Sequence, residues 1–371
     1  MAGKAALSRG LQAGTHWSHP LGDGRLQCDL CPRDCKLQEC QHGACLIRER
    51  HGDAIELTSW GRSSGFCVDP IEKKPLNHFH PGSKVLSFGT AGCNLACKFC
   101  QNWDISHSRE LDKLQDSATP AQLASTARQL DCLSVAFTYN DPVIFAEYAL
   151  DVADACHATG IRTVAVSAGY IHAKPRQLFF AAMDAANIDL KGFSEDFYKR
   201  YCGARLAPVL DTLQHIRHES SCWLEITTLL IPDANDSQAE ITALCRWVHD
   251  ELGADVPLHF TAFHPDYRLT DRPPTPAATL QLARQIGLDH GLLHVYTGNV
   301  ATPDGGTTFC PDCGKALIVR QGYRISDYAL DESGHCLACG ARLAGRFSAY
   351  AGSFGNRRIP VHLHSGQPRI P

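Results

Sequence analysis

The sequence predicts an α/β fold in which parallel strands alternate with helices. The middle of the chain holds short apolar runs rich in Val, Ile, Leu and Phe that lack strict alternation, as expected for strands buried on both faces. Helical stretches separate several of these runs. Repeated strand–helix units imply right-handed crossovers, which produce either a doubly wound sheet or a β/α barrel.

The expected elements lie between residues 83 and 300. We predict strands at Lys84–Gly89, Ser134–Thr138, Arg162–Ser167, Ala186–Leu190, Trp223–Ile231, Leu258–Ala262 and His294–Gly298. We predict helices at Pro120–Gln129, Pro142–Thr159, Leu206–Glu219, Ser237–Leu252 and Pro276–Gly287. Both candidate architectures place functional residues at the carboxyl ends of the strands.

Two cysteine-rich regions flank this main unit. We divide the chain into an N-terminal Cys-rich region (24–82), the α/β unit (83–300), a compact Cys-rich module (308–347) and a tail rich in Gly, Pro and Arg (348–371). With 371 residues the chain can bury a large core.

Composition narrows the class of protein. A formal net charge of −4 and a pI near 6.5 give no electrostatic basis for binding nucleic acid or an anionic membrane. No apolar run approaches the ~20 residues of a membrane span, and Met1–Trp17 lacks the apolar core of a signal peptide. Most of the 18 cysteines fall in metal-ligand patterns, so we expect reduced thiols and a cytoplasmic protein. Five of the isolated cysteines are expected to be small buried apolar residues, namely Cys132, Cys156, Cys202, Cys222 and Cys245.

Cys93, Cys97 and Cys100 follow the first predicted strand of the α/β unit, within a Gly-rich run. Their C-x3-C-x2-C spacing can hold three irons of a [4Fe-4S] cluster, whereas an electron-transfer ferredoxin supplies a fourth cysteine. One iron would then stay open for a small molecule. A zinc site is the alternative, but zinc prefers paired C-x2-C knuckles and four protein ligands in a structural site.

This run resembles the cluster motif of the radical SAM superfamily, C-x3-C-x-Φ-C, with Phe99 as the aromatic residue Φ. The stretches Asp69–Phe79, Cys100–Ser106, Asn187–Lys191 and Glu225–Pro232 are similar to the AmmeMemoRadiSam group, relatives of the pyruvate formate-lyase activating enzyme. The resemblance covers about residues 26–345. It implies a partial (β/α)6 barrel, S-adenosylmethionine (SAM) chelated by the open iron, and Phe99 near its adenine.

The resemblance also carries over other contacts to SAM. Asn140 and Asp141 occupy the segment that contacts the methionine amino group, with Asp in place of the usual Glu. Ser167 stands at a ribose contact, although Ala168 replaces a common Asn.

Further polar residues end the later strands. Asp189 and Lys191 alternate onto one face, which a barrel would turn inward, so both are candidate catalytic residues and Lys191 suits the SAM carboxylate. A structural salt bridge is the alternative. His264, after the Leu258–Ala262 strand, is either a ligand contact or a core histidine.

Weaker candidates come from two other places. Thr228 and Glu225 lie on the fifth predicted strand. The resemblance puts Lys73 and Lys74 near the site, although a solvated charged turn would explain them as well.

Two more cysteine groups have metal-ligand spacing. Two C-x2-C knuckles form a zinc-ribbon pattern, whose ligands are Cys310, Cys313, Cys336 and Cys339. We expect a structural zinc ion here. A partner-docking module, a redox site and a rubredoxin-like iron site are the alternatives. The N-terminal group has irregular spacing that suits neither zinc nor a second [4Fe-4S] cluster well, and we favour zinc; its ligands are Cys28, Cys31, Cys35 and Cys45. Cys40 has no assigned role.

The cysteine motif and the strand–helix units predict a radical SAM enzyme, and the resemblance implies an activase-like oxidoreductase. It would reductively cleave SAM to a 5′-deoxyadenosyl radical and act on a protein or peptide partner. Action on a small metabolite and a non-catalytic iron–sulfur electron carrier are the alternatives. The resemblance implies a reductant such as flavodoxin or ferredoxin, and it names Memo-type and AMMECR1-type proteins as candidate partners.

Overall fold

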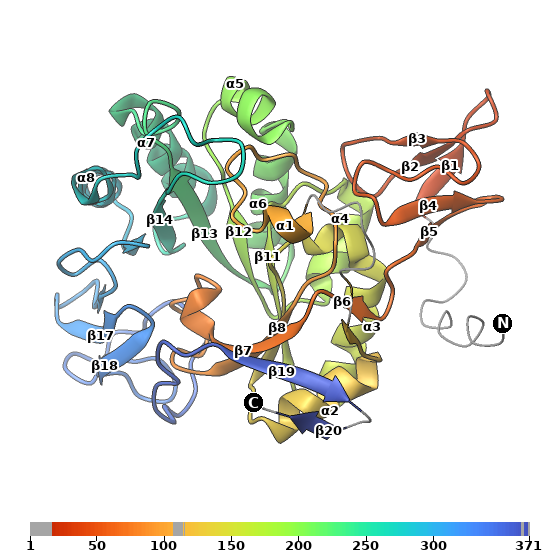
Figure 1. Ribbon diagram of the computed structural model, residues 1–371. Helices are drawn as coiled ribbons and strands as arrows, with labels where there is room; N and C mark the ends of the chain where they lie inside the picture. The colour runs from red at the N-terminus through yellow and green to blue at the C-terminus, as the bar shows by residue number, and fades with distance from the viewer. Residues whose placement is uncertain (1–16, 107–113, 115, 365–366, 370–371) are drawn as a thin grey trace.

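A ten-stranded sheet forms the centre of the protein in a computed structural model, which describes residues 17–106, 114, 116–364 and 367–369 (Figure 1). The order along the sheet is β15-β14-β13-β12-β11-β10-β8-β7-β19-β20. Its strands are β7 (Phe66–Pro70), β8 (Lys84–Phe88), β10 (Ser134–Phe137), β11 (Arg162–Ser167), β12 (Ala185–Asp189), β13 (Trp223–Leu230), β14 (Leu258–Ala262), β15 (Val295–Gly298), β19 (Ile359–His364) and β20 (Gln367–Arg369). The prediction that Met1–Trp17 is not a signal peptide concerns mostly residues 1–16, which lie outside the described residues.

Within this sheet β8 and the strands from β10 to β15 are all parallel and follow one another in chain order, which is the arrangement of a barrel rather than of a doubly wound sheet. β15 and β20 are the sheet's two ends, so this barrel is partial. The predicted α/β partial barrel is confirmed, and β15, predicted as a strand at His294–Gly298, adds a seventh parallel strand to the six of the (β/α)6 barrel that the resemblance implies.

Helices cover the outer side of the curved sheet (Figure 1). They are α2 (Pro120–Gln129), α3 (Ala146–His157), α4 (Ala173–Ala181), α6 (Ala207–Glu219), α7 (Gln238–Trp247) and α8 (Ala277–Asp289), and shorter turns are α1 (Trp103–Ser106) and α5 (Glu195–Phe197). A capping box at Thr119 starts α2, and the Ser237 side chain caps α7. α4 is a helix that was not predicted from the sequence, because Pro175 interrupts the usual helical signal near its start.

Two predicted helices are composite. The expected helix at Pro142–Thr159 begins as the 3-10 turn η3 (Pro142–Phe145), and the one at Ser237–Leu252 ends as the π-helical turn η5 (Val248–Leu252). Another 3-10 turn, η1 (Ile71–Lys73), and the π-turn η4 (Tyr198–Cys202) complete the helical elements.

The N-terminal region forms a lobe of short strands at the right of Figure 1. Its strands are β1 (Ser18–Pro20), β2 (Leu26–Cys28) and β3 (Lys36–Leu37) in one sheet, and the hairpin of β4 (Arg48–His51) and β5 (Ala54–Leu57). The next strand, β6 (Arg62–Ser63), lies outside this lobe and pairs with β9 (Asp116–Ser117). The Cys-rich module at the other side has a zinc-ribbon-like form and contains β16 (Thr308–Phe309), β17 (Ala316–Gln321) and β18 (Arg324–Tyr328).

The chain beyond residue 348 returns to the main sheet. β19 pairs antiparallel with β7, which itself pairs antiparallel with β8. This return places Arg358, directly before β19, beside the first strands of the barrel. The segment that composition marks as a tail therefore contributes to the barrel wall.

Candidate active site

The loop after β8 carries Cys93, Cys97 and Cys100, and its conformation depends on Asn140. The Asn140 side-chain oxygen accepts a hydrogen bond from the Thr90 N–H (3.0 Å), and its amide donates to the Gly92 carbonyl (2.8 Å). A Cβ at Gly89 would clash with the Thr138 carbonyl, so only glycine allows this close approach. Asn140 is thus placed behind the loop and holds it from within.

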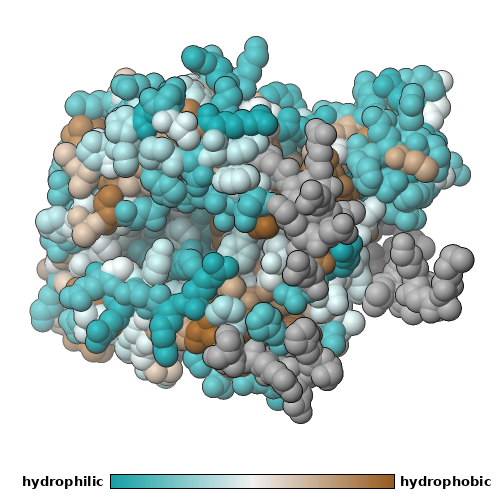
Figure 2. Space-filling model, in the orientation of Figure 1, coloured by the Kyte–Doolittle hydropathy of each residue, from teal (hydrophilic) through white to brown (hydrophobic). Residues whose placement is uncertain are grey.

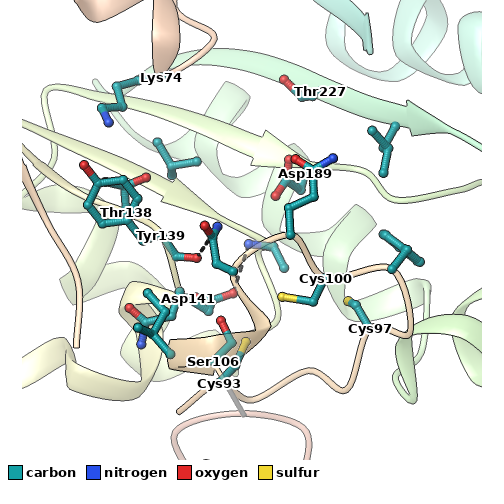
Figure 3. A pocket seen from close by; sticks show the side chains of 18 of the residues that line it. Lys74, Cys93, Cys97, Cys100, Ser106, Thr138, Tyr139, Asp141, Asp189 and Thr227 are labelled. Carbon is teal, nitrogen blue, oxygen red and sulfur yellow. Dashed lines mark hydrogen bonds between the residues drawn. The ribbon is translucent and has the colours of Figure 1, made fainter. Parts of the chain in front are cut away.

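The three cysteines line a cavity of about 800 Å³ at the carboxyl end of the parallel strands. Figure 3 shows the cysteine side chains on one side of this cavity, Asp141 and Asp189 along its wall, and Lys74 and Tyr139 on the opposite side. The face drawn in Figure 2 is hollowed near its centre. Six of the predicted site residues therefore share one space with the cysteines or form its rim, namely Phe99, Asn140, Asp141, Asp189, Lys191 and His264.

The sulfur arrangement suits a multi-iron cluster better than a single ion. Among the described residues, Cys93, Cys97 and Cys100 do not form a group whose sulfurs all lie within 4.8 Å of one another. Ligands of one zinc ion at ~2.3 Å must converge more closely than that, whereas a cubane holds each thiolate on a separate iron. The Leu95 N–H points at the Cys93 sulfur (3.5 Å), a donor of the kind that tunes iron–sulfur clusters.

Burial raises the pKa of Cys93 and of Cys100 above the usual thiol value. Metal binding must therefore displace protons from these thiols. A fourth thiol, Cys202, lies against Cys97, and their mutual hydrogen bond, with burial, raises the pKa of Cys97. Cys202 is fully buried and is not among the cavity-lining residues.

Lys191 and Asp189 form an ion pair at the end of β12, with 2.7 Å between Lys191 Nζ and Asp189 Oδ2. Burial alone would lower the pKa of Lys191, but the Asp189 carboxylate and the Cys97 thiol raise it above its ordinary value. The Asn235 amide also donates to the Lys191 carbonyl (2.8 Å). The ammonium group is thus fixed, charged and beside the cysteine loop.

Asp141 is buried in the cavity wall at the start of η3. Its carboxylate accepts hydrogen bonds from the Val143 N–H (3.0 Å), the Ala168 N–H (2.9 Å) and the Ser167 hydroxyl (3.0 Å). Burial raises the pKa of Asp141 despite these donors. Ser167 is not among the cavity-lining residues, so the structure places it as a support for Asp141 rather than at the cavity surface.

Phe99 and His264 lie at different depths. Phe99 is buried and its ring is 6.0 Å from that of Phe197, which gives the cavity an apolar wall beside the cysteines. His264 is exposed at the rim. Its Nδ1 lies 3.4 Å from the Pro265 carbonyl, and the core-histidine alternative does not hold for it.

A cationic cluster on the opposite side of the cavity was only partly anticipated. Asp69 pairs with Lys74 (2.7 Å) and Lys73 (3.1 Å) and accepts a hydrogen bond from the Tyr139 hydroxyl (2.9 Å). Arg358 lies over the Tyr139 ring (5.7 Å) and donates to the Cys67 sulfur (3.2 Å). Resemblance indicated the two lysines, but no sequence signal joined them to Arg358.

This cluster perturbs its own ionisable groups. Burial lowers the pKa of Lys74 to about 8, and Asp69 offsets part of that effect. Burial alone would raise the pKa of Asp69, but Lys74 and Lys73 lower it to about 2. Three cations here face a single carboxylate, so the cluster has a surplus of positive charge.

The structure does not bring Glu225 or Thr228 to the cavity. The Thr228 hydroxyl donates to the Leu190 carbonyl (2.8 Å). Glu225 lies near the start of β13, fully buried at the amino end of the barrel. Further along β13, the side chains that line the cavity at the carboxyl end are those of Thr227 and Leu229.

The two other cysteine groups differ in geometry. In the C-terminal module all four sulfurs lie within 4.8 Å of one another, with 3.6 Å between Cys310 and Cys339 and 3.8 Å between Cys313 and Cys336. The N-terminal cysteines line a separate, small cavity.

A family model described as the radical SAM superfamily matches residues 88–245, which contain the cysteine loop and the strands from β10 to β13. A protein of Methanocaldococcus jannaschii, described only as uncharacterized, is 38% identical over 324 residues, covering 87% of this chain and 96% of that protein. The chain belongs to the radical SAM superfamily. Membership implies a [4Fe-4S] cluster and SAM as cofactors, together with a reductant.

Similar solved structures have low identity to this radical SAM chain. A domain of the pyruvate-formate lyase-activating enzyme from Bacteroides vulgatus is 17% identical, covers 45% of this chain and 99% of that domain, and has a TM-score of 0.40. SuiB of Streptococcus suis is 14% identical, covers 62% of this chain and 52% of its own, and has a TM-score of 0.47. In the described part of this chain, we find no helix with the length and apolarity needed to cross a membrane.

Proposed function

We propose that this protein is a radical SAM enzyme of the AmmeMemoRadiSam group that acts on an anionic site of a protein or peptide partner, as an activase-like enzyme does. One observation carries the proposal: a single cavity has three cysteines on one side and a cationic cluster on the other. An electron carrier has no use for such a cavity. The open cavity therefore favours catalysis.

In this proposal Cys93, Cys97 and Cys100 hold the [4Fe-4S] cluster and leave one iron for SAM. When bound there, the cluster and SAM would supply radical chemistry, the removal of a hydrogen atom from the substrate. The chain's own residues bind SAM and orient it. Lys191 is the charge partner of the SAM carboxylate, and Asp189 fixes the direction of its ammonium group.

The remaining contacts position SAM and exclude water. Asp141 faces the SAM amino group, and Ser167 holds the Asp141 carboxylate in place. Phe99 supplies an apolar surface for the adenine. Asn140 positions the cluster loop rather than SAM, because its side-chain amide is already hydrogen-bonded to the backbone of Thr90 and Gly92. His264 at the rim can approach bound SAM only from the solvent side.

The cationic cluster is the proposed substrate side. The cluster has three cations, Lys73, Lys74 and Arg358, but only one carboxylate, that of Asp69. This net positive charge favours a negatively charged substrate group such as a peptide carboxylate. The N-terminal lobe and the C-terminal module lie on either side of the cavity-bearing barrel and extend the surface open to a partner (Figure 1). A small anionic metabolite is the second candidate, supported by the same charges.

Resemblance supports the rest of the assignment. We propose Memo-type and AMMECR1-type proteins as partners, a flavodoxin or ferredoxin as reductant, and a reducing cytoplasm as the compartment. We propose zinc at Cys310, Cys313, Cys336 and Cys339, because tetrahedral Zn–S bonds of ~2.3 Å place ligand sulfurs ~3.8 Å apart, close to the 3.6 and 3.8 Å found here.

The test is anaerobic reconstitution with iron and sulfide, followed by dithionite and SAM, with mass spectrometry of 5′-deoxyadenosine. We expect product from the wild type and none from a Cys93/Cys97/Cys100→Ala triple variant. Cys40→Gly is the matched control, since Cys40 is exposed and its φ of +59° suits glycine. Absence of SAM binding by the fully loaded wild type would overturn the proposal in favour of a carrier.

A further inference from the structure

The N-terminal cysteine group differs from the C-terminal one in how its sulfurs are arranged. Both groups contain four cysteines, yet only the C-terminal sulfurs converge within 4.8 Å of one another. Among the described residues, no three of Cys28, Cys31, Cys35 and Cys45 meet that distance. Four ligands of one zinc ion have to converge, so this arrangement argues against zinc and for ligands on separate irons.

The space between these four cysteines is a small buried cavity. Three of the cysteines are buried. The rest of the lining combines apolar side chains with three polar ones, namely Leu30, Leu37, Ile144, Arg33, Arg48 and Asn94. By contrast, Cys313 and Cys339 of the C-terminal group are exposed. Burial and the polar groups that surround it are among the features that set the potential of an iron–sulfur cluster.

Hydrogen-bond donors face this cavity. The Ala44 N–H donates to the Cys35 sulfur (3.4 Å), and the Arg33 N–H donates to Cys31. Arg48 also lines the cavity and is almost fully buried, with a charge partner in Glu147 (2.6 Å). Its Nε–H has no hydrogen-bond partner among the described residues. A cluster with inorganic sulfides offers acceptors for such a donor, whereas a zinc ion offers none of its own.

The N-terminal group also touches the active-site loop. The Cys45 carbonyl lies against Gly92, the residue before Cys93, so closely that a Cβ at Gly92 would clash with it. The Arg33 guanidinium donates to the Asn94 carbonyl (2.5 Å), and Asn94 itself lines the N-terminal cavity. A cofactor bound by the N-terminal cysteines would therefore be a neighbour of the Cys93 group.

We infer that Cys28, Cys31, Cys35 and Cys45 bind a second [4Fe-4S] cluster, fully ligated by protein. Its role rests on the proposed function: it accepts one electron from a low-potential donor such as reduced flavodoxin or ferredoxin and passes one electron toward the Cys93 group. It returns to its oxidised state after each transfer, so no other reactant is needed. This assignment replaces the zinc expected from the sequence.

The decisive experiment uses the full-length Cys93/Cys97/Cys100→Ala variant, reconstituted anaerobically. Because the catalytic cysteines are gone, any cubane must sit elsewhere. We expect about four iron and four sulfide per chain, and an electron paramagnetic resonance signal of a reduced [4Fe-4S] cluster after dithionite. Two zinc ions and no iron in this variant would overturn the inference, even if the wild type cleaves SAM.

A second set of variants assigns the signal to its ligands. In the triple-variant background, Cys31→Ala or Cys45→Ala should remove the signal, whereas Cys40→Gly should leave it unchanged. Cys40 lies in an exposed group with Glu39 and His51, so this control also excludes that group as the source of iron. If the Cys31 or Cys45 variant does not fold, iron per chain in the wild type decides: about eight supports the inference and about four contradicts it.

Discussion

The two ends of the barrel both bury charged side chains, but they use them differently. At the amino end, the Glu225 carboxylate accepts hydrogen bonds from the Asn77 N–H (2.9 Å), the His78 N–H (2.7 Å) and the Trp223 indole (3.1 Å), and it pairs with His259 (2.7 Å). Glu225 does not line the cavity at the carboxyl end.

At the carboxyl end, by contrast, Lys74, Asp141 and Lys191 face about 800 Å³ of open space. Each has protein partners, yet each also borders room for a ligand. Burial of charge therefore indicates a functional site only where a cavity adjoins the charge. The amino-end network has the features of a structural clamp between the barrel and the segment from Asn77 to His80.

The largest expected effect is the loss of that clamp. Glu225→Gln replaces an acceptor of several N–H groups with an amide, and we expect the free energy of unfolding to fall by about 3–5 kcal/mol. Denaturant titration measures this loss. Glu219→Gln, at an exposed position of α6, should change stability by less than about 0.5 kcal/mol. SAM affinity of the folded Glu225 variant should be unchanged, and a selective loss of SAM binding would remove the distinction between the two ends.

The next prediction concerns Lys74 and pH. Its pKa is about 8 in the folded chain against 10.5 in the unfolded one, so between these values the unfolded state binds more protons. Stability contributed by this site therefore rises with pH across that window, and the cost of burying the charge is fully present below pH 8. Relative to Lys74→Met, the wild type should gain about 3 kcal/mol between pH 8 and 10.5.

Parallel denaturation series of the two proteins measure this difference. A Lys174→Met variant serves as the control, since Lys174 is exposed on α4 and should show no such window. Identical pH slopes for wild type and Lys74→Met would mean that Lys74 is solvated, as the charged-turn alternative supposes.

Much of the barrel could be predicted from the sequence because its signals are local. The bounds of β11, β14 and α2 match the predicted ranges, since apolar runs and capping residues fix them within a few residues. The cysteine loop was equally clear, because its ligands lie within eight residues.

Features that depend on distant parts of the chain could not be predicted. Arg358 reaches the cavity only because β19 returns to β7, a pairing across about 290 residues with no local signal. The position of Glu225 along the barrel axis could not be predicted either. Alternation along a strand shows that a residue faces the barrel interior, but it does not show in which layer of the interior the residue lies. The arrangement of the N-terminal sulfurs likewise follows from tertiary packing, and the irregular spacing of these cysteines in the sequence suits neither zinc nor a [4Fe-4S] cluster well.

A smaller effect is expected at the carboxyl end when Lys191 is replaced. Lys191→Met removes the proposed partner of the SAM carboxylate, and we expect SAM affinity to fall 10- to 100-fold, or about 1.4–2.8 kcal/mol. Iron content should stay the same, because Lys191 is not a cluster ligand. Equilibrium binding of SAM to the reconstituted protein measures the change, with Lys174→Met as the charge-matched control. A drop in stability with normal SAM affinity would show that the Lys191–Asp189 pair is structural, like Glu225 and His259.

The smallest effect is expected at Cys202, which tests whether the cavity's open iron is real. Cys202 contacts Cys97 but is not among the cavity-lining residues, and two thiols in contact cannot ligate separate corners of a cubane. Cys202→Ala should therefore leave iron content and SAM binding unchanged and lower stability by roughly 1 kcal/mol, as for a small buried truncation. Electron paramagnetic resonance of the reduced cluster with and without SAM is the sensitive readout. A SAM-induced spectral change that appears only in the variant would identify Cys202 as a fourth ligand that closes the site, and the carboxyl end would then resemble a carrier rather than an enzyme.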